Sequence, residues 1–423
     1  MKFLSTRNPN VQITASEAII KGLAPDGGLY IPEEFKKIRW DDLATDDPVT
    51  FAHKLLESYF EDDFLKESLL AHCKKAFSFP LPVNELSNGQ KVLELFHGPT
   101  CAFKDVGARF LSSAISKLPN ANNKPRLVLV ATSGDTGGAV AAAFNDYPDI
   151  RVAILYPKGK VSKRQEQQLT CWNKHILAFS VEGTFDDCQR LVKEAFLNDH
   201  WNSHWELISA NSISVARLLP QMVYYALTSL NYYKKNEIFA EFIIPTGNLG
   251  NAVAAFWAKK MGMPIDKIGL ALNANDSIIN YTRSGVWKPQ PSKVTLANAM
   301  DVGSPSNIER LFNLYPDRID LNKISEAVSA TDEDIKNTIQ KVYKELNYII
   351  CPHTATAFYA QSKLKWDDPI LVSTAHPAKF EKIVEPLIKK PVTIPPALQN
   401  ILSLPSRKIE IEASLDRLNE NLI

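Results

Sequence analysis

Short, mainly apolar runs that alternate with runs of helical spacing are the feature that most narrows the folds open to this sequence. The short runs predict buried strands at 126–131, 150–156, 241–245, 268–272 and 370–373. Apolar residues at helical spacing follow at 139–144, 185–196 and 252–258. Strands that alternate with helices predict an α/β fold with mostly parallel sheets flanked by helices. Because ligands of such folds bind beyond the carboxyl ends of strands, we expect a site near residues 132, 246 and 374.

The two ends of the chain lack this alternation. Residues 1–85 are expected to form a mostly helical segment with one conspicuous turn, Asp26-Gly27-Gly28, whose glycines supply positive φ angles. The proline-rich stretch from residue 386 predicts an extended tail that ends in a short helix at 415–422. We assign no chemistry to that tail.

Composition excludes several classes of protein. With 423 residues, 45% of them hydrophobic, the chain is long enough for a large core and for two or three domains. A net charge of +1 with 22% charged residues lacks the charge excess of nucleic-acid-binding or membrane-surface proteins. The five cysteines are odd in number, widely spaced and without a CxxC pair, which disfavours a disulfide scaffold or a zinc site. We therefore expect a cytoplasmic protein, since no secretion signal or membrane-spanning apolar run is visible either.

The turn Thr246-Gly247-Asn248-Leu249-Gly250-Asn251 joins a predicted strand to a predicted helix. Its two glycines would let backbone amides approach an anion closely, and the start of the helix adds free N–H groups and a favourable dipole. The pattern favours a phosphate cradle without the lysine of a Walker motif. The alternative is a plain corner in which the glycines only relieve steric crowding.

A second glycine-rich turn, Thr132-Ser133-Gly134-Asp135-Thr136-Gly137-Gly138, also joins a strand to a helix. Its hydroxyl groups and exposed amides would suit a carboxylate or a second phosphate. It does not match GxGxxG, so the dinucleotide-binding fingerprint is absent. The alternative is a capped helix start, with Ser133, Asp135 or Thr136 as the N-cap.

Two further segments carry polar side chains of possible function. In Asn211-Ser212-Ile213-Ser214-Val215-Ala216-Arg217, the first two residues can cap a helix and the arginine fork matches phosphate oxygens, although a surface arginine is the simpler interpretation. Thr374 ends a predicted strand, where its hydroxyl could meet a ring nitrogen. His376 precedes a proline and is more often structural in such a place. His97 and Lys379 are ambiguous.

Lys104 follows the turn-forming Gly98-Pro99 and begins an apolar pattern of helical spacing that continues through Val106 and Phe110. A helix N-terminus and apolar neighbours both favour a neutral lysine amine. A neutral amine is what a Schiff base with an aldehyde cofactor requires. Most lysines are solvated surface charges, so Lys104 gains weight only together with the two glycine-rich turns. No HExxH, GxSxG or clustered His/Cys set supports zinc or serine hydrolysis, and we expect no metal.

Together these segments resemble the threonine synthase family of pyridoxal-phosphate (PLP) enzymes of fold type II, and the resemblance runs from residue 22 to residue 380. The strings most specific to that family are Leu93-Glu94-Leu95-Phe96-His97-Gly98-Pro99-Thr100, Phe103-Lys104-Asp105 and Asn298-Ala299-Met300-Asp301-Val302. The resemblance implies a family-type N-terminal domain at 1–85, a PLP-binding catalytic region at 86–385 and a C-terminal extension at 386–423. Within the catalytic region it implies a large domain with a small one inserted around 105–180.

The resemblance also implies roles for the residues around the cofactor. Lys104 would be the lysine that forms the Schiff base and the catalytic residue. The phosphate loop would comprise Gly247, Asn248, Leu249, Gly250 and Asn251, with Asn248 also placed to reach the 3′ oxygen of the ring. Thr374 would hold the pyridine nitrogen. Many relatives carry Phe at position 249 and Asp at position 251, and we expect little loss from Leu and Asn there because backbone amides make most of the contacts.

For the substrate, the resemblance implies O-phospho-L-homoserine, with L-threonine and phosphate as products of a β,γ-replacement. Its carboxylate would meet Ser133, Gly134, Asp135 and Thr136, and its phosphate would meet Asn211, Ser212 and Arg217. The lysine would move the Cα and Cβ protons. The family's N-terminal segment and small domain would close over the substrate.

Other functions remain open from the sequence alone. A related phospho-lyase would release a 2-keto acid, and a non-catalytic phosphate-binding module would use only the two glycine turns. An NAD dehydrogenase lacks its fingerprint and a ribose-binding acid. We expect a monomer without an appended regulatory domain.

Overall fold

The N-terminal segment contains a small sheet that the sequence did not predict. The computed structural model describes residues 1–43, 45–120 and 123–422, so residues 44, 121–122 and 423 of the expected regions lie outside it. Strands β1 (Phe3–Ser5), β2 (Gln12–Ile13) and β3 (Tyr30–Pro32) pair antiparallel in the order β2-β1-β3. Strands of two or three residues are too short to display an alternating pattern, so the expectation of a mostly helical segment was incomplete.

The helices of this segment are as expected in kind. They are α1 (Ala15–Lys21), α2 (Pro48–Leu56) and α3 (Leu69–Ala76), with single 3₁₀ turns at Trp40–Leu43, Glu57–Phe60 and Lys66–Ser68. Helix α1 begins with a full capping box, in which Thr14 and Glu17 each accept from the other's backbone amide. Gly27, at φ +77°, forms the predicted turn and leads into β3.

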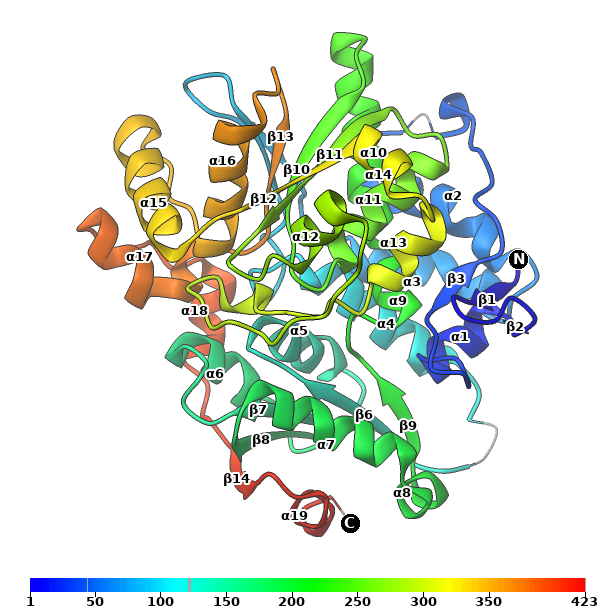
Figure 1. The fold of residues 1–423 in the computed structure, drawn as a ribbon. Coiled ribbons are helices and arrows are strands. Elements are labelled where there is room, and N and C mark those ends of the chain that lie inside the picture. The colour runs from blue at the N-terminus through cyan, green and yellow to red at the C-terminus, as the bar shows by residue number, and fades with distance from the viewer. Residues whose placement is uncertain (44, 121–122, 423) are drawn as a thin grey trace.

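A six-stranded sheet forms the larger part of the molecule (Figure 1). Its order is β12-β11-β10-β13-β5-β4, and every pair is parallel except β4–β5 at one edge. The strands are β4 (Val83–Glu85), β5 (Lys91–Glu94), β10 (Ala240–Pro245), β11 (Ile265–Leu272), β12 (Ser325–Ser329) and β13 (Ile370–Ser373). Both faces are apolar: Phe242 and Ile244 of β10 join one core cluster, and Ile243 joins another on the opposite face.

Helices cover both faces of this sheet, as the alternating pattern predicts. They are α10 (Gln221–Asn236), α11 (Gly250–Lys260), α12 (Ser277–Ser284), α13 (Ile308–Leu314), α14 (Arg318–Ile324), α15 (Asp332–Leu346), α16 (Pro352–Leu364) and α17 (Glu381–Ile388). Single 3₁₀ turns lie at Asn298–Met300 and Pro377–Phe380.

A second, all-parallel sheet lies below the first in Figure 1, with the order β14-β8-β7-β6-β9. Its strands are β6 (Arg126–Ala131), β7 (Ile150–Pro157), β8 (Ile176–Glu182), β9 (Glu206–Ser209) and β14 (Ile409–Glu412). Its helices are α5 (Asp135–Phe144), α6 (Lys163–Thr170), α7 (Phe185–Leu197), α8 (Asp199–His204), α18 (Pro396–Leu402) and α19 (Leu415–Glu420). Helices α4 (Lys104–Lys117) and α9 (Val215–Leu218) lie between the two sheets in the picture.

The strands expected at 126–131 and 370–373 have those bounds in the structure, and the other three predicted strands are confirmed with longer ends. The short helix expected at 415–422 is present as α19, but the tail before it was predicted wrongly. Instead of running extended to its last helix, the chain forms α18 and then β14, which pairs in parallel with β8 and closes one edge of the second sheet. The pattern of β14 is hidden because three of its four residues are not fully buried.

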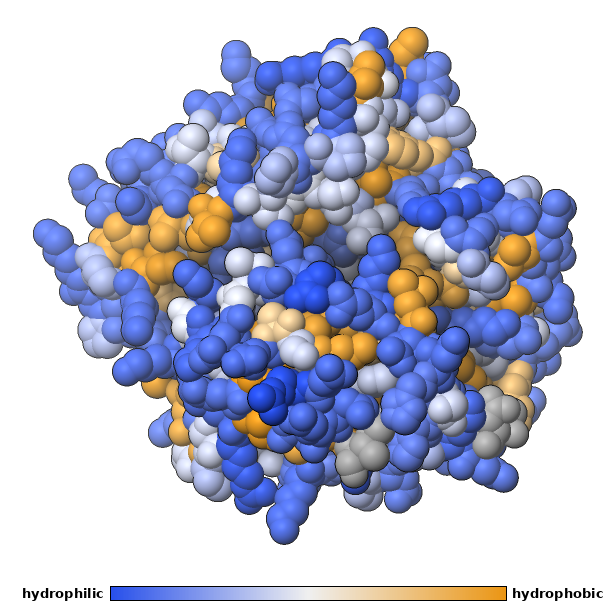
Figure 2. All heavy atoms as spheres, turned by 60° about the horizontal axis from the view of Figure 1, so that its bottom comes forward, coloured by the Kyte–Doolittle hydropathy of each residue, from blue (hydrophilic) through white to orange (hydrophobic). Residues whose placement is uncertain are grey.

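The surface is mainly hydrophilic on the face shown in Figure 2, where apolar side chains gather in separate patches. Among the described residues, every helix is either too short or too polar to cross a bilayer.

Replacing Ile411 by Ala tests the docking of the tail. The Ile411 side chain is 6% exposed in the core cluster that contains Phe179 and Val181. We expect the free energy of unfolding, measured in urea, to fall by about 2–4 kcal/mol, because a buried aliphatic side chain leaves a cavity. Glu412→Ala on the same strand, where the side chain is exposed, is the control and should change it by less than about 0.5 kcal/mol. Equal values for the two variants would contradict a docked β14.

Candidate active site

The carboxyl edge of the six-stranded sheet brings three predicted elements together. The parallel register pairs Phe242 with Ile370 and Ile243 with Leu371, so the same register continued places Thr246 beside Thr374. Adjacent strands lie about 4.8 Å apart. The backbone N–H of Phe103 donates to the Thr374 carbonyl at 2.9 Å, which fixes the start of α4 against the end of β13. Lys104, Thr374 and the bend at 246–251 therefore occupy neighbouring positions.

Lys104 is the first residue of α4, as predicted. Its side chain is 15% exposed, and its Nζ lies 4.0 Å from Oδ2 of Asp135. Burial lowers the pKa of the amine to about 8, Asp135 opposes that change, and Lys379 and Arg217 add to it. A minor fraction of the amine is therefore neutral at neutral pH, larger than for an exposed lysine, and this is the state that reacts with an aldehyde.

The bend at 246–251 has the backbone geometry of an anion cradle. Leu249 has φ +63°, a left-handed conformation that is uncommon for a bulky residue, and it precedes α11 without any side-chain cap. The first turn of α11 also carries no acidic side chain. A left-handed residue before an uncapped helix turns several N–H groups toward one point, which is where an anion binds.

Gly247 allows the bend to lie against the 3₁₀ turn at Asn298–Met300. A Cβ atom at Gly247 would stand 2.5 Å from the Cα of Met300 and 2.9 Å from its carbonyl oxygen. These contacts are shorter than real Cβ atoms make, so only glycine fits there. At Gly250 the nearest contacts of a Cβ would be 3.5 Å, which is ordinary. The two glycines of the turn therefore have different roles.

Asn248 links the bend to the segment at 211–213. Its side-chain amide donates to the Ser212 hydroxyl at 2.5 Å, and its Oδ1 accepts from the Ser306 backbone at 2.6 Å. Asn307 donates to the backbone oxygens of both Asn248 and Ser212. The two predicted phosphate-binding segments thus adjoin.

Asn251 is buried near the start of α11. Its Oδ1 accepts from the hydroxyls of Tyr224 (α10) and Tyr225 (α10). Its Nδ2 is buried and has no hydrogen-bond partner in the described part of the chain. An unsatisfied buried donor is costly, which fits a site that is completed by a ligand.

The turn at 132–138 caps its helix differently from the prediction. The N-cap of α5 is Gly134, with φ +134°, and no side chain of Ser133, Asp135 or Thr136 caps it. Instead the Thr132 hydroxyl accepts from the backbone amides of Gly134 and Gly137, both at 2.9 Å. Ser133 and Thr136 remain half-buried.

Asp135 holds two other side chains as well as facing Lys104. Its Oδ1 lies 2.8 Å from Nζ of Lys379 and accepts from Gln165 Nε2 at 3.0 Å. Burial would raise the pKa of the Asp135 carboxyl, but Lys379 and Lys104 outweigh it and hold the pKa below its usual range. Since this carboxylate is already paired, any anion at this turn would meet amides and hydroxyls. Lys379 was ambiguous in the sequence, and only its full burial shows where it belongs.

Arg217 is not a surface arginine. It is 2% exposed in α9, and burial lowers the pKa of its guanidinium to about 10. Its Nη1 donates to the Ala210 carbonyl at 2.5 Å, while its Nε has no hydrogen-bond partner among the described residues. Gly107 of α4 brings it close to the lysine's helix, since a Cβ there would be 2.6 Å from the Arg217 carbonyl.

Sequence reasoning missed Arg310, a fully buried residue of α13. It donates to the carbonyls of Tyr30 and Ile213 and to Oδ1 of Asn307, so it ties the N-terminal segment to the 211–213 segment and the bend. The sequence around Arg310 contains no motif that points to this role, and only its contacts in the structure identify it.

His376 is structural: its Nδ1 accepts from the Ala378 backbone at 3.1 Å, and burial lowers the pKa of the ring to about 4. His97 contacts Glu94 at 2.7 Å and is one-third exposed. Among the described residues, no group of His, Cys, Asp and Glu is arranged to hold a metal ion.

These residues fit a PLP cofactor. The bend offers an uncapped helix start for a phosphate, and Lys104 offers a buried amine whose pKa is depressed. Two buried donors, Nε of Arg217 and Nδ2 of Asn251, have no hydrogen-bond partner in the described chain.

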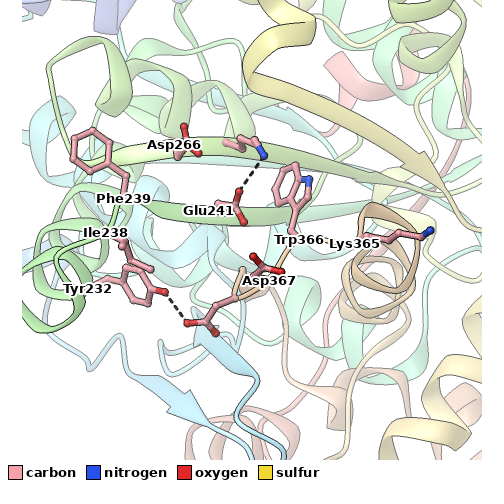
Figure 3. A pocket seen from close by; sticks show the side chains of 10 residues that line it. Tyr232, Ile238, Phe239, Glu241, Asp266, Lys365, Trp366 and Asp367 are labelled. Atoms are coloured by element: carbon pink, nitrogen blue, oxygen red, sulfur yellow. Dashed lines mark hydrogen bonds and ion pairs between the residues drawn. The ribbon is translucent and has the colours of Figure 1, made fainter.

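A separate cavity of about 340 Å³ lies at the opposite, amino edge of the same sheet, near the starts of β10 and β11. Figure 3 shows Tyr232, Phe239 and Trp366 around it, together with Glu241 and Asp266. None of the predicted site residues lines it.

Comparison with known proteins gives three matched segments. Residues 88–373 match the family described as "Pyridoxal-phosphate dependent enzyme", residues 2–77 match "Threonine synthase N terminus", and residues 353–421 match "Threonine synthase, C-terminal". Threonine synthase of Buchnera aphidicola subsp. Acyrthosiphon pisum is 38% identical, with 100% of both chains covered.

Two solved structures are similar along the whole chain. The crystal structure of threonine synthase from Escherichia coli has a TM-score of 0.92 at 34% identity and covers 100% of this chain and 99% of its own. PLP-bound threonine synthase from Brucella melitensis has a TM-score of 0.92 at 30% identity, with 100% and 98% covered. The predicted fold class is thereby confirmed.

Gly247→Ala tests the packing of the bend. We expect the free energy of unfolding to fall by about 1–3 kcal/mol, because the added methyl group meets the Met300 backbone, which cannot rotate away. Gly250→Ala in the same turn is the matched control, since its methyl group makes only ordinary contacts. Chemical denaturation of both variants measures the difference. If Gly250→Ala were the more damaging change, the two glycines would have been assigned wrongly.

Proposed function

The chain belongs to the threonine synthase family of PLP-dependent enzymes, and we propose that it converts O-phospho-L-homoserine and water to L-threonine and phosphate. Full-length similarity to threonine synthases supports the reaction. The residue assignment is supported by the buried Lys104 amine and by the hydrogen bond from Phe103 to Thr374, which brings the start of α4 to the sheet edge where the bend at 246–251 begins.

PLP is held, in this proposal, by Lys104, by Thr374 and by the bend Gly247, Asn248, Leu249, Gly250 and Asn251. The cofactor supplies an aldehyde for the amine and a conjugated ring that accepts electron density from substrate carbon. Thr374 presents a neutral hydroxyl to the ring nitrogen, so it orients the ring without adding charge. Asn248 is shared between the bend and Ser212, which couples the cofactor side of the site to the substrate side.

The turn of Ser133, Gly134, Asp135 and Thr136 binds the substrate carboxylate. The support for this role is the paired state of Asp135, whose negative charge is taken up by Lys379 and Gln165. The Ser133 and Thr136 side chains are half-buried and can donate from the start of α5.

The substrate phosphate meets Asn211, Ser212 and Arg217. Arg217 carries a buried charge and an unpaired Nε, and a phosphate oxygen would satisfy both. Arg310 holds this segment in place through the Ile213 carbonyl. As the phosphate leaves, Arg217 stabilises the charge that develops on it.

Lys104 moves the protons. Its free amine takes the proton from substrate Cα and carries the Cβ proton, because the depressed pKa leaves a usable fraction unprotonated near pH 8. Burial of the site excludes bulk water from these steps. Once the phosphate has left, Cγ takes up a proton, water adds its hydroxyl at Cβ, and a proton returned to Cα gives L-threonine.

We further propose a monomeric, cytoplasmic enzyme, and the five buried free cysteines support the location because they suit a reducing compartment. The proposed regions are an N-terminal domain at 1–85, a catalytic region at 86–385 with a small domain inserted around 105–180, and an extension at 386–423. The matched segments 2–77, 88–373 and 353–421 support this order.

Lys104→Ala tests the lysine. We expect formation of threonine and phosphate from phosphohomoserine to fall at least about 10³-fold, because the change removes the amine that this proposal assigns to the cofactor and to the proton transfers. The visible absorbance of the bound cofactor should also be lost, and borohydride should no longer fix a label at position 104. A variant that kept the absorbance band would exclude Lys104 as the anchor. Detection of 2-oxobutyrate instead of threonine in the unmodified enzyme would favour the phospho-lyase.

Arg217→Ala tests the phosphate assignment. We expect KM for phosphohomoserine to rise at least about 30-fold while PLP affinity stays the same, because the guanidinium faces the substrate phosphate. Arg217→Lys keeps the positive charge but not the two-pronged guanidinium, so its KM should lie between those of the unmodified enzyme and Arg217→Ala. Loss of PLP affinity with an unchanged KM would mean that the two phosphate sites have been exchanged.

A further inference from the structure

One carboxylate lies between two buried lysines in the candidate active site. Asp135 Oδ1 is 2.8 Å from Nζ of Lys379, and Asp135 Oδ2 is 4.0 Å from Nζ of Lys104. The Lys379 ammonium also donates to the Thr100 carbonyl at 2.8 Å. The shorter and better satisfied pair is therefore the one with Lys379, although Lys104 is the lysine that must react.

We infer that Lys379 is a positioning residue whose ammonium holds the Asp135 carboxylate and so leaves the Lys104 amine without a close counter-ion. This inference rests on the proposed role of Lys104. Without Lys379, Asp135 would have only Lys104 as a cationic partner nearby and would favour its protonated form. A protonated amine has no lone pair to offer to an aldehyde or to a substrate proton.

Both parts of the fold fix Lys379. It lies in the 3₁₀ turn after β13, while Asp135 begins α5 of the second sheet. From α6, Arg164 donates to the Ala378 carbonyl at 2.5 Å and the Ser162 hydroxyl donates to the Lys379 carbonyl at 3.0 Å. The ammonium is thus held at its carboxylate by contacts that do not involve Lys104.

Four titratable or charged groups from other elements act on Lys104: Asp135, Lys379, Arg217 and His353. Burial lowers the pKa of His353 to about 4, so its ring is neutral at neutral pH and adds no charge. Arg217 lowers the pKa of Lys104, as Lys379 does, and only Asp135 raises it. Burial is the largest cause of the lowered pKa of Lys104, and among the charged groups Asp135 and Lys379 act on it most strongly and in opposite directions.

Asp105, the neighbour of Lys104 on α4, is engaged elsewhere. Its two oxygens accept from the Thr100 amide at 2.9 Å and from the Thr100 hydroxyl at 2.7 Å. Thr100 therefore contacts Asp105 through its amide and hydroxyl, and Lys379 through its carbonyl. Asp105 does not replace Asp135 as the acidic partner of Lys379.

The test measures the reactivity of the Lys104 amine directly. The full-length chain, stripped of cofactor, is labelled with trace acetic anhydride at a series of pH values, and the label on the Lys104 peptide is quantified by mass spectrometry. Lys379→Met should raise the midpoint of labelling by about one pH unit. The reason is that Asp135, freed from Lys379, would stabilise the protonated form of Lys104 by about tenfold. Asp135→Asn should lower the midpoint, and the double variant should return toward the unmodified protein.

Opposite shifts are the signature, because loss of packing alone would not move the midpoint in both directions. Lys382→Met replaces an exposed lysine three residues further along the chain and is the control, which should leave the labelling midpoint of Lys104 unchanged. Equal midpoints in Asp135→Asn and the unmodified protein would overturn the inference, even if Lys379→Met does not fold. If PLP and borohydride failed to label Lys104 in the unmodified chain, the proposed function itself would fall, which is a different outcome.

Discussion

The hydrogen bond from Phe103 to the Thr374 carbonyl joins the part of the site that carries the lysine to the part that carries the strands. It works only because β13 lies between β10 and β5 in a parallel sheet, so that all three strands end at the same edge. A change of register by one residue would turn Thr374 to the other face. The relative placement of Lys104, Thr374 and the bend therefore derives from strand order more than from any single side chain.

Buried positive charge is the second constraint. Lys104, Lys379 and Arg217 are all largely withdrawn from water, and the acids that act on them are Asp135 for the two lysines and Asp105 for the arginine. Burying cations without anions is costly, and backbone carbonyls offset only part of that cost. A ligand with two negative groups, such as a phosphorylated amino acid, would complete the balance. The Nε of Arg217 and the Nδ2 of Asn251, which have no hydrogen-bond partner in the described chain, are consistent with a site that binds a ligand.

Sequence reasoning found the parts of the fold that periodicity encodes. Strands such as 126–131 and 370–373, and the helix start at Lys104, follow from local pattern. It missed the local capping role of Thr132, because Ser133, Asp135 and Thr136 were the cap candidates in that turn. It also missed two contacts between residues far apart in the chain, Lys379 with Asp135 and Arg310 with Tyr30, and neither of these has a local signal. The short strands β1, β2, β3, β4 and β14 were missed for another reason, since two to four residues show no period. Strands β5, β8, β9 and β12 were not predicted either.

Strand β14 has a consequence for how the polypeptide reaches this state. The second sheet is built from residues 126–209, yet its β8 edge is paired only by residues 409–412. During synthesis that edge stays open until nearly the whole protein has left the ribosome, and an open edge can pair with another nascent molecule. The C-terminal residues therefore protect this sheet edge from pairing with other molecules. Shortening the C-terminus would promote aggregation before it affected the candidate active site.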